Sequence, residues 1–600
     1  MATFALDCET YPNFFLAVFR DVDGEAEHRF HAVDGMCLTR EDVSQVQNIV
    51  TENRIVTFNG EAFDLPILSA ACTGASTYEL HTLAQSLIAT RDRPKVHVKP
   101  KEHVDLFAIA PAPKASLKIY GSRIGCKRLQ DLPIAPDKEL TLEERAIVTD
   151  YCANSDIPAT IALYHTLKEP IHLREILGAR IGESFLAKAD AQIAARVIGK
   201  ALGRPQKPPT SDFSFRYAPP PFLKFRSRLL RSLLASLQAL EFGWKDGKVY
   251  MPQELTDLVL PIGNSSYSMG IGGLHSCEKS RAVIADDAHG LRDLDVTSYY
   301  PSIIINNGYS PEHIGREFLN ILAGIKHERV EHKRAGHKSD ANSLKIVINA
   351  AYGNMGSQYS FLFSPKSLVH TTITGQLSLL MLIERLELAG IPVISANTDG
   401  IVVHYPRDRE LEFMAIANEW QRDTFFELEA TDYAALYSRD VNNYIAVKIG
   451  GGTKGKGAFA HHWKDTSPDA SQLSKNPTGQ ICVEAVHEFL EHGTPVEDTI
   501  ELCKDLKKFV FVRSVTGGAS IYHEQELLQE PKPPTPIGKS VRWYYSNETF
   551  DTLHATKTGN KVPGADRVRV CQVLPDDFPS DIDYARYIIT AKKALTSLGA

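Results

Sequence analysis

At 600 residues the chain is too long for one hydrophobic core, and usual domain sizes predict three to five domains. Its content of 43% hydrophobic and 23% charged residues is that of an ordinary soluble protein. The net charge of −7 argues against a uniformly basic nucleic-acid-binding protein. Local basic clusters can nevertheless follow a phosphate backbone, with solvated helix faces as the alternative explanation. These clusters lie at 95–103, 223–231, 326–338, 448–457 and 504–513.

The cysteines and the absence of targeting signals in the given sequence predict a cytoplasmic protein. The nine cysteines are odd in number and scattered, with no C-x-x-C pair and no zinc-ligand spacing, which indicates reduced thiols. No signal-peptide core precedes FALDCETY, and no stretch reaches the roughly 18 apolar residues of a membrane span. We therefore expect no membrane partner.

The first predicted strand carries two carboxylates on one face. In TFALDCETYPNFFLAVF, from residue 3, Asp7 and Glu9 are two positions apart, so both side chains point to the same side of a strand. Like charges placed in this way are destabilising unless a cation lies between them.

Two further segments add polar residues of the same kind. The apolar run 54–68 contains Asn59, Phe63 and Asp64, and a predicted helix over 141–164 contains Tyr151 and Asp156. Four carboxylates on three elements are what two divalent metal ions, about 3.5–4 Å apart, need to cleave a phosphodiester.

The middle of the chain carries a strand and a helix with polar residues in ordered positions. GLRDLDVTSYYPSIIINNGYSP reads as a strand with Asp295, followed by Ser298, Tyr299 and Tyr300. In SLKIVINAAYGNMGS three side chains fall at i, i+4 and i+7, one stripe of a helix; they are Lys345, Asn349 and Tyr352.

A predicted hairpin, PVISANTDGIVVHY, ends in a tight turn with Asp399 at its tip. Turn chemistry alone can explain this residue, because Asn and Asp bond to their own backbone and tolerate left-handed geometry. Metal binding is the other explanation, and the turn by itself does not decide between them.

Taken together, these stretches resemble a known family. D-x-E, N-x-x-x-F-D and a helix with Tyr and Asp are similar to the three motifs of 3′→5′ proofreading exonuclease domains. The three later stretches resemble the A, B and C motifs of family B DNA polymerases, D-x-x-S-L-Y-P-S, K-x-x-x-N-x-x-Y-G and D-T-D, in that order. The resemblance is closest to compact bacteriophage replicative polymerases.

The resemblance implies an α+β multidomain chain, with an RNase-H-like α/β exonuclease domain and a right-hand polymerase of palm, fingers and thumb. The expected divisions are exonuclease 1–185, connecting region 186–290, motif A 291–302, fingers 303–360, palm with motif C 361–480 and thumb 481–600.

In the exonuclease domain the resemblance implies that Asp7, Glu9, Asp64 and Asp156 are metal ligands. Tyr151 would position the attacking water, and Asn59 and Phe63 would contact DNA. The family spaces Tyr and Asp four apart, whereas this chain spaces them five apart. Five residues rotate about 140° on a regular helix, so one regular face cannot carry both roles. An inserted residue such as Ser155, or Cys152 in the tyrosine's place, are the two explanations.

In the polymerase the resemblance implies that Asp295, Asp399 and Val296 bind two Mg²⁺ ions, for which Mn²⁺ can substitute. Tyr300 would exclude a 2′-hydroxyl, and Asn349 and Tyr352 would shape the base-pair pocket. The remaining implied nucleotide contacts are Arg329, Lys333, Lys345, Ser298 and Tyr299. The first Asp of D-T-D is Asn397 here, and the Leu of motif A is Tyr299. We expect activity to survive the change to Asn397, because the second Asp is the ligand in the family, and we expect the larger ring of Tyr299 still to lie in the palm core.

DNA contacts are expected in three further places. The Gly/Ser-rich stretch 264–280 resembles a template-contacting Y-x-G-G loop through Gly272 and Gly273, with a plain linker as the alternative. The stretch 441–459 resembles the K-x-Y segment at the primer terminus, with Tyr444 matching and Lys454 and Lys456 supplying charge. In the thumb, Lys539 and Arg542 are the expected phosphate contacts.

The predicted function is therefore a DNA-directed DNA polymerase with 3′→5′ exonuclease, in phage-type genome replication in a host bacterial cytoplasm. The expected partners are primer-template DNA, dNTPs and replisome proteins of phage or host. Only 42 residues lie between Ser302 and Lys345, so we expect a nucleic-acid primer and no terminal protein. A reverse transcriptase or RNA polymerase is disfavoured by Tyr300 and by the exonuclease motifs.

Two alternatives are a polymerase-fold protein acting mainly as a 3′→5′ exonuclease and a non-catalytic primer-template binding protein. The pair Asp295 and Asp399, together with Lys345, argues against both, because clustered carboxylates repel one another unless a metal is bound.

Overall fold

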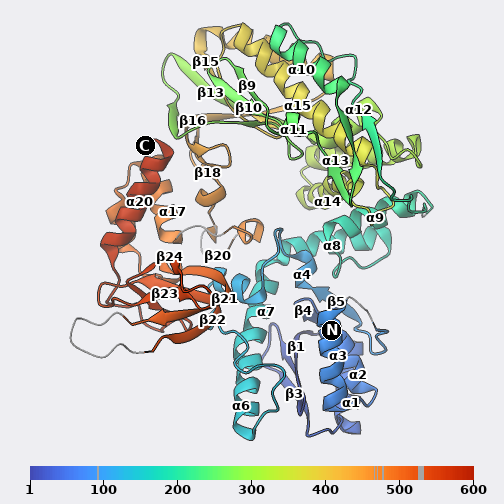
Figure 1. Ribbon diagram of the computed structural model, residues 1–600, viewed down its shortest axis with the longest axis vertical. Coiled ribbons are helices and arrows are strands. Elements are labelled where there is room, and N and C mark those ends of the chain that lie inside the picture. The colour runs from blue at the N-terminus through green and yellow to red at the C-terminus, as the bar shows by residue number, and fades with distance from the viewer. Residues whose placement is uncertain are drawn as a thin grey trace.

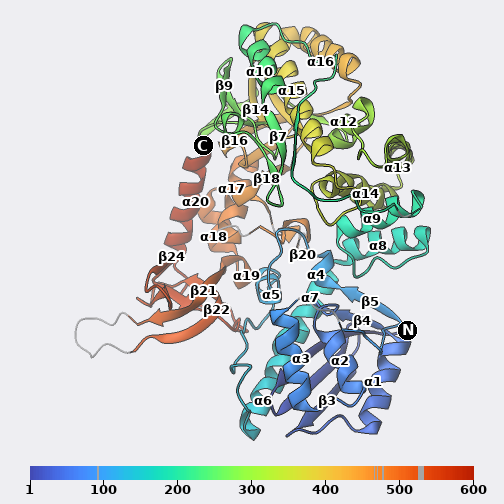
Figure 2. The ribbon, with the colours of Figure 1, turned by 45° about the vertical axis from the view of Figure 1, so that its right-hand side comes forward.

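The computed structural model describes residues 1–90, 94–203, 205–461, 463–464, 467–468, 470–475, 479–523 and 533–600. Figures 1 and 2 show an N-terminal unit, a large central sheet with its helices, and a C-terminal unit that lies beside both. Sheets and helices alternate along the chain in several separate cores, which confirms the predicted α+β multidomain fold class. Among the helices of the described residues, none is both long enough and apolar enough to cross a membrane.

The N-terminal unit is built on a mixed five-stranded sheet in the order β3-β2-β1-β4-β5. Strand β1 runs antiparallel to β2 and parallel to β4. The strands are β1 (Thr3–Tyr11), β2 (Phe14–Asp21), β3 (Glu27–Val33), β4 (Arg54–Thr57) and β5 (Glu102–Asp105). The helices are α1 (Arg40–Glu52), α2 (Asp64–Cys72), α3 (Thr77–Ala89), α4 (Leu106–Ile109), α5 (Leu117–Arg123), α6 (Leu142–Tyr151) and α7 (Ile157–Thr166).

Alternation along β1 assigns its two faces to different helices. Phe4, Leu6 and Cys8 pack in the core formed with α1, α2 and α3, whereas Ala5 packs in the core formed with α6 and α7. Asp7 shares the face of Ala5, because side chains two apart lie on one side of a strand. The first carboxylates of the chain therefore point toward α6 and α7.

The central sheet has ten strands, in the order β18-β17-β16-β13-β15-β14-β11-β10-β9, with β12 paired to β16. Its strands are β9 (Val259–Ile262), β10 (Ser265–Ser268), β11 (His275–Ser276), β12 (Arg281–Ile284), β13 (His289–Val296), β14 (Val393–Asn397), β15 (Gly400–Pro406), β16 (Leu428–Asp440), β17 (Asn443–Lys448) and β18 (Thr453–Lys456). Helices α10 (Arg228–Ala239), α12 (Tyr299–Asn307), α15 (Pro365–Leu388) and α16 (Glu410–Thr424) contribute to its apolar core.

A helical pair stands beside this sheet. It consists of α13 (Arg316–Arg334) and α14 (Lys338–Met355), which pack on each other. Helices α8 (Lys168–Ile181) and α9 (Asp190–Ala201) pack on α14 and connect the pair to the N-terminal unit (Figure 2). A small sheet of β6 (Phe213–Arg216), β7 (Glu241–Lys245) and β8 (Lys248–Tyr250) and the short helix α11 (Gln253–Thr256) complete the region.

The C-terminal unit combines helices with a five-stranded sheet, β24-β23-β21-β22-β25. The helices are α17 (Gln480–His492), α18 (Val496–Leu502), α19 (Leu506–Phe509) and α20 (Tyr584–Leu598), and the strands are β21 (Phe511–Tyr522), β22 (Thr535–Tyr545), β23 (Thr552–Ala555), β24 (Lys561–Asp566) and β25 (Val568–Val570). Helix α20 returns to β16, so the C-terminus lies beside the central sheet (Figure 1).

The segment just before the C-terminal unit is fixed to the N-terminal unit. Leu473 is fully buried in the core formed by β1, α6 and α7. Its carbonyl oxygen accepts a hydrogen bond of 2.6 Å from Arg123 Nη1. Residues more than 300 positions apart thus belong to one hydrophobic core.

Candidate active sites

A cavity of about 460 Å³ opens between the central sheet and the pair α13–α14. It collects residues from five segments of the chain. The sequence-predicted residues that line it are Asp295, Val296, Ser298, Tyr299, Tyr300, Arg329, Lys333, Lys345, Asn349, Tyr352 and Asp399. Three residues without a predicted role, Thr297, Pro301 and Glu429, complete the lining.

Antiparallel pairing of β13 with the hairpin strand β15 brings the two aspartates into this cavity. Asp295 is the register partner of Gly400, and the Val296 N–H donates to the Asp399 carbonyl oxygen at 2.8 Å. A Cβ on Gly400 would lie 3.0 Å from both Asp295 Oδ1 and the Leu294 carbonyl oxygen, so a larger residue would push the two strands or the Asp295 side chain aside. Strand pairing therefore joins carboxylates that are 104 positions apart in sequence.

The electrostatics of this pair suit a divalent cation. Burial, followed by the charges of Asp399 and Asp293, raises the pKa of Asp295 to about 7. Burial also raises the pKa of Asp399, against the opposing effect of Lys456. Neighbouring carboxylates that resist ionisation together form a donor set of hard oxygen atoms, which is what Mg²⁺ and Mn²⁺ bind.

The hairpin tip is held by the Gly-rich loop before β11. Thr398 has φ of +59°, and its N–H donates to the Leu274 carbonyl oxygen at 2.8 Å. A Cβ on Gly273, which has φ of +128°, would lie 3.1 Å from Thr398 Cα. The loop thus packs directly on the tip, and the description of 264–280 as a plain linker does not fit.

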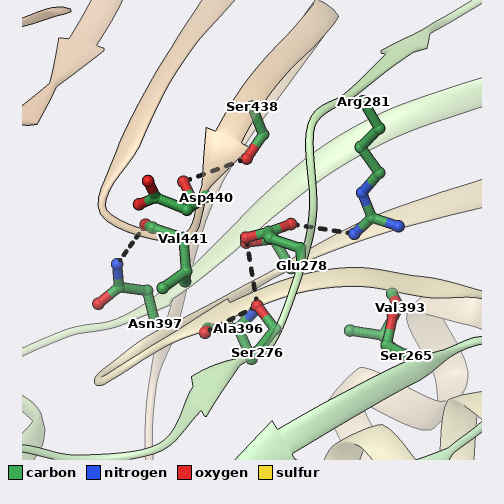
Figure 3. A network of polar contacts seen from close by, with 11 residues as sticks. Ser265, Ser276, Glu278, Arg281, Val393, Ala396, Asn397, Ser438, Asp440 and Val441 are labelled. Carbon is green, nitrogen blue, oxygen red and sulfur yellow. Dashed lines mark hydrogen bonds and ion pairs between the residues drawn. The ribbon is translucent and has the colours of Figure 1, made fainter. Parts of the chain in front are cut away.

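A buried network behind β14 fixes the same hairpin (Figure 3). The Glu278 side chain, which is only 3% exposed, accepts from Ser395 Oγ at 2.8 Å and pairs with Arg281 at 3.0 Å. Ser276 Oγ accepts from the Ala396 N–H at 3.0 Å. Sequence reasoning missed Glu278, because one carboxylate in a Gly/Ser-rich stretch forms no motif.

Asn397 makes a contact that a carboxylate could not make. Its Nδ2 donates to the Val441 carbonyl oxygen at 2.9 Å, as Figure 3 shows, and lies 3.4 Å from Asn442 Oδ1. The amide thereby ties the hairpin to the turn between β16 and β17.

Cationic and amide side chains reach the cavity from the helical pair. Arg329 Nη1 on α13 donates to Ser298 Oγ at 2.7 Å, while Arg329 Nε is buried without a partner among the described residues. Lys333 forms an ion pair with Glu429. Lys345 and Asn349, one turn apart on α14, have exposed side chains.

Ser298 has φ of +50°, so its strained backbone lies at the site.

Tyrosines form the wall of the cavity nearest the Gly-rich loop. The rings of Tyr300 and Tyr352 stack at 4.2 Å, and the Tyr300 hydroxyl donates to the Gly272 carbonyl oxygen at 3.4 Å. Tyr299 points into the core, where its hydroxyl donates to the Gly375 carbonyl oxygen at 2.5 Å. The larger ring in place of leucine is thus accommodated, as expected.

The segment predicted to lie at a primer terminus reaches the carboxylates from β18. Lys454 Nζ lies 3.4 Å from Asp293 Oδ2, and Lys456 Nζ lies 5.9 Å from the Tyr444 ring centroid. Tyr433 also donates to Asp293 at 2.6 Å. Asp293 and Tyr433 lacked a sequence signal, since neither falls within a motif.

A second cavity, of about 580 Å³, lies in the N-terminal unit at the end of β1. It contains most of the residues predicted there, and Phe58, Phe107 and Lys114 in addition. The predicted residues that line it are Asp7, Glu9, Asn59, Phe63, Asp64 and Tyr151.

The carboxylates of this cavity are crowded and buried. Asp64, at the start of α2, accepts from the Cys8 N–H at 3.0 Å, which places it beside β1. Burial, and next the charge of Asp156, raises the pKa of Asp7 to about 7. Burial also raises the pKa of Glu9 and of Asp64, with Asp7 as the next cause in each case. This oxygen-rich set also fits hard divalent ions.

The five-residue spacing between Tyr151 and Asp156 is accommodated by a change of helix type. Residues Cys152–Asp156 form a π-helical turn between α6 and α7, closed by a hydrogen bond from the Ile157 N–H to the Cys152 carbonyl oxygen. A π turn absorbs one extra residue, so positions i and i+5 share a face. Tyr151 therefore lies in the cavity in spite of the spacing, and the helix is not regular as the rotation argument assumed.

Lys118 on α5 links the two residues and was missed from the sequence. Its Nζ lies 2.5 Å from the Tyr151 hydroxyl and forms an ion pair with Asp156. Burial lowers the pKa of Lys118, but the charge of Asp156 and its neighbours outweighs burial and raises the pKa overall. Asp156 Oδ1 is buried without a partner among the described residues. A lone lysine on a short helix carries no motif.

The prediction that Arg542 contacts a DNA phosphate is wrong, because this side chain is fully buried. Its guanidinium donates to four carbonyl oxygens, two in the N-terminal unit and two in the C-terminal unit, which leaves no surface for a phosphate. The acceptors are Cys126, Lys127, Cys571 and Gln572. Lys539 remains exposed, with its backbone N–H bonded to Asp131.

Comparison with known proteins finds no matching family model. A stretch of 148 residues is 31% identical to DNA polymerase II of Escherichia coli (strain K12), covering 20% of this chain and 19% of that protein. The chain thus matches about a fifth of the length of this curated relative. The solved structure of the family B DNA polymerase from the hyperthermophilic archaeon Pyrobaculum calidifontis aligns with 100% of this chain and 78% of its own, at 14% identity and a TM-score of 0.41.

Proposed function

We propose that this chain is a DNA-directed DNA polymerase that extends a primer 3′ end and also removes nucleotides by 3′→5′ hydrolysis. The observation that carries the proposal is the cavity in which Asp295 and Asp399 of the central sheet face Arg329, Lys345 and Asn349 of the helical pair. Carboxylates on one wall and cations on the opposite wall are the arrangement that a metal-bound nucleoside triphosphate requires.

Each wall has a separate task. Asp295 and Asp399 would hold two Mg²⁺ ions, which supply charge stabilisation and an activated 3′-hydroxyl when bound. Arg329 Nε, buried and unpaired, and the exposed Lys345 would bind phosphate oxygens. Tyr300, stacked on Tyr352, would pack under the sugar and leave no room for a 2′-hydroxyl.

The second cavity would perform the hydrolysis. Asp7, Glu9, Asp64 and Asp156 would hold the metal ions, and Tyr151, fixed by Lys118, would orient the attacking water. Phe63 and Asn59 line the same cavity and would hold the primer end. Replication of a phage-type genome on a nucleic-acid primer is the setting we propose, with the central sheet as palm, α13–α14 as fingers and the C-terminal unit as thumb.

A polymerase-fold protein that acts mainly as a nuclease is the second candidate, since Asn397 removes a carboxylate from motif C. The contact of the Asn397 amide with Val441 supports the first candidate, because it gives this residue a structural role in an intact site.

The test is extension of a labelled DNA primer on a DNA template with Mg²⁺ and dNTPs, comparing the wild type with Asp399→Ala and Asp7→Ala. We expect Asp399→Ala to lose extension and keep 3′ shortening, and Asp7→Ala to show the reverse. Asp257→Ala, changed at an exposed site outside both cavities, is the control. Shortening without extension by the wild type at high dNTP would overturn the polymerase proposal and leave the nuclease.

A further inference from the structure

The turn between α13 and α14 holds three potential metal ligands outside both cavities. Helix α13 ends in a Schellman arrangement. The Gly336 N–H donates to the Lys333 carbonyl oxygen at 3.3 Å, and the His337 N–H donates to the His332 carbonyl oxygen at 2.9 Å. Gly336 has φ of +78°, the left-handed conformation that this motif uses.

This backbone geometry explains why two histidines meet. In a Schellman motif the third-last helical residue and the second residue beyond the cap come into side-chain contact, and this pair is usually apolar. Here the two positions are His332 and His337, whose ring centroids are 5.8 Å apart. Two imidazoles at these positions make less hydrophobic contact than an apolar pair would, which indicates that they serve a purpose other than packing.

Asp340, in the first turn of α14, completes the group. One ligand atom from each of His332, His337 and Asp340 lies within 4.8 Å of the other two. Neighbouring ligand atoms around a tetrahedral Zn²⁺ are about 3.4 Å apart, given bonds of about 2.0–2.1 Å. The three side chains are half-buried or exposed, so rotation of their side chains can close this gap.

The donor types select the metal. Two imidazoles and one carboxylate suit Zn²⁺, Co²⁺ or Ni²⁺, whereas Mg²⁺ and Ca²⁺ prefer oxygen ligands alone. Glu328 Oε1, one helical turn before, lies 3.5 Å from His332 Nε2. A carboxylate beside the ring is the partner that metal-bound histidines usually have.

We propose that His332, His337 and Asp340 form a site for one divalent transition-metal ion that joins α13 to α14. The bound ion fixes the angle between two helices that carry Arg329 and Lys345 into the central cavity. The site stands on its own ligands and does not depend on the proposed polymerase activity.

The experiment is titration of the full chain with Co²⁺ in excess Mg²⁺, so that Mg²⁺ occupies the oxygen-rich sites. Visible absorption of the Co²⁺ complex and bound metal after dialysis are compared in the wild type, the double variant His332→Ala/His337→Ala, and Asp340→Asn. His327→Ala is the control, since His327 is exposed on α13 and lies outside the group.

We expect wild type and His327→Ala to bind one Co²⁺ more per chain than the double variant, with an absorption spectrum that the double variant lacks. Asp340→Asn should bind Co²⁺ more weakly than the wild type. Zn²⁺ should raise the melting temperature of the wild type and leave that of the double variant unchanged. Equal stoichiometry and equal spectra in the wild type and a folded double variant would overturn the site, whatever primer extension shows.

Discussion

Asn397 lies at the turn of the β14–β15 hairpin, where its amide nitrogen faces the Val441 carbonyl oxygen at 2.9 Å. A carboxylate in this place would turn an acceptor toward an acceptor and add charge beside Asp399. An unmet buried polar contact costs about 1–3 kcal/mol.

We therefore expect Asn397→Asp, which restores the D-T-D motif, to lower kcat/KM for dNTP incorporation about tenfold or more, because about 1.4 kcal/mol corresponds to a factor of ten in rate. Single-nucleotide incorporation measures this, with Asn418→Asp on the exposed face of α16 as the charge-matched control. A faster Asn397→Asp protein would show that the chain works with a ligand missing.

Lys118 is a cation whose charge lowers the pKa values of the buried carboxylates Asp7 and Glu9, against the larger effect of burial. We expect Lys118→Met to slow 3′ shortening by about 10²-fold, the usual effect of removing one preorganised donor, and to leave primer extension intact. Lys114→Met is the matched control, since Lys114 lines the same cavity but donates to the Ala108 carbonyl oxygen at 3.2 Å. If Lys118→Met and Lys114→Met shorten the primer at equal rates, Lys118 contributes only to the stability of the fold and has no part in hydrolysis.

At the scale of elements, motifs with several side chains in a fixed pattern were predictable. Asp295, Lys345 and Asp399 were assigned to one site because their stretches resemble three ordered motifs of family B DNA polymerases, and all three line one cavity. The π turn at Cys152–Asp156 was not predictable from the period of a regular helix, although the spacing signalled an irregularity. Lys118, Glu278 and Arg542 depend on partners far along the chain, which leave no local pattern.

The packing of β18 on α17 contains a histidine that is kept neutral. His487 Nε2 donates to the Phe459 carbonyl oxygen at 2.9 Å, and Thr453 Oγ1 lies 2.6 Å from Nδ1. Burial, followed by the charge of His461, lowers the pKa of His487 to about 3. Between pH 6.5 and 3 the unfolded chain binds a proton there that the folded chain does not, so stability falls as pH falls through this window.

We expect this group to cost about 1.4 kcal/mol of stability between pH 7.5 and 5.5, since one unit below an unfolded pKa near 6.5 corresponds to this amount. His487→Gln should therefore show a shallower pH dependence of unfolding than the wild type. Denaturant titrations of both proteins at these pH values measure the difference, in which groups that do not contact residue 487 cancel. Parallel curves would contradict the assignment.

At the scale of the whole molecule, Arg542 joins the C-terminal sheet to the N-terminal unit. Burial lowers the pKa of Arg542 to about 10, so the guanidinium remains charged at neutral pH and the carbonyl oxygens around it stabilise that charge. Removing the guanidinium leaves buried carbonyl oxygens without a donor, which costs about 1–3 kcal/mol for each unsatisfied group.

We expect Arg542→Met to lower the melting temperature and to make the loop at 126–131 and the segment at 571–574 more sensitive to protease. Differential scanning calorimetry and limited proteolysis test this, with the exposed Arg513→Met on β21 as control. Unchanged proteolysis in Arg542→Met would show that the two units are held together by other contacts.

The position of Leu473 has a consequence for how the protein is made. A ribosome has produced β1, α6 and α7 long before it reaches Leu473, yet this side chain is fully enclosed by their core. Until Leu473 has been synthesised, the core of the nascent N-terminal unit lacks one apolar side chain. Packing of this core is therefore completed late in synthesis. A fragment that stops before this residue is expected to be less stable than the same unit within the full chain, because a buried leucine contributes about 2–5 kcal/mol.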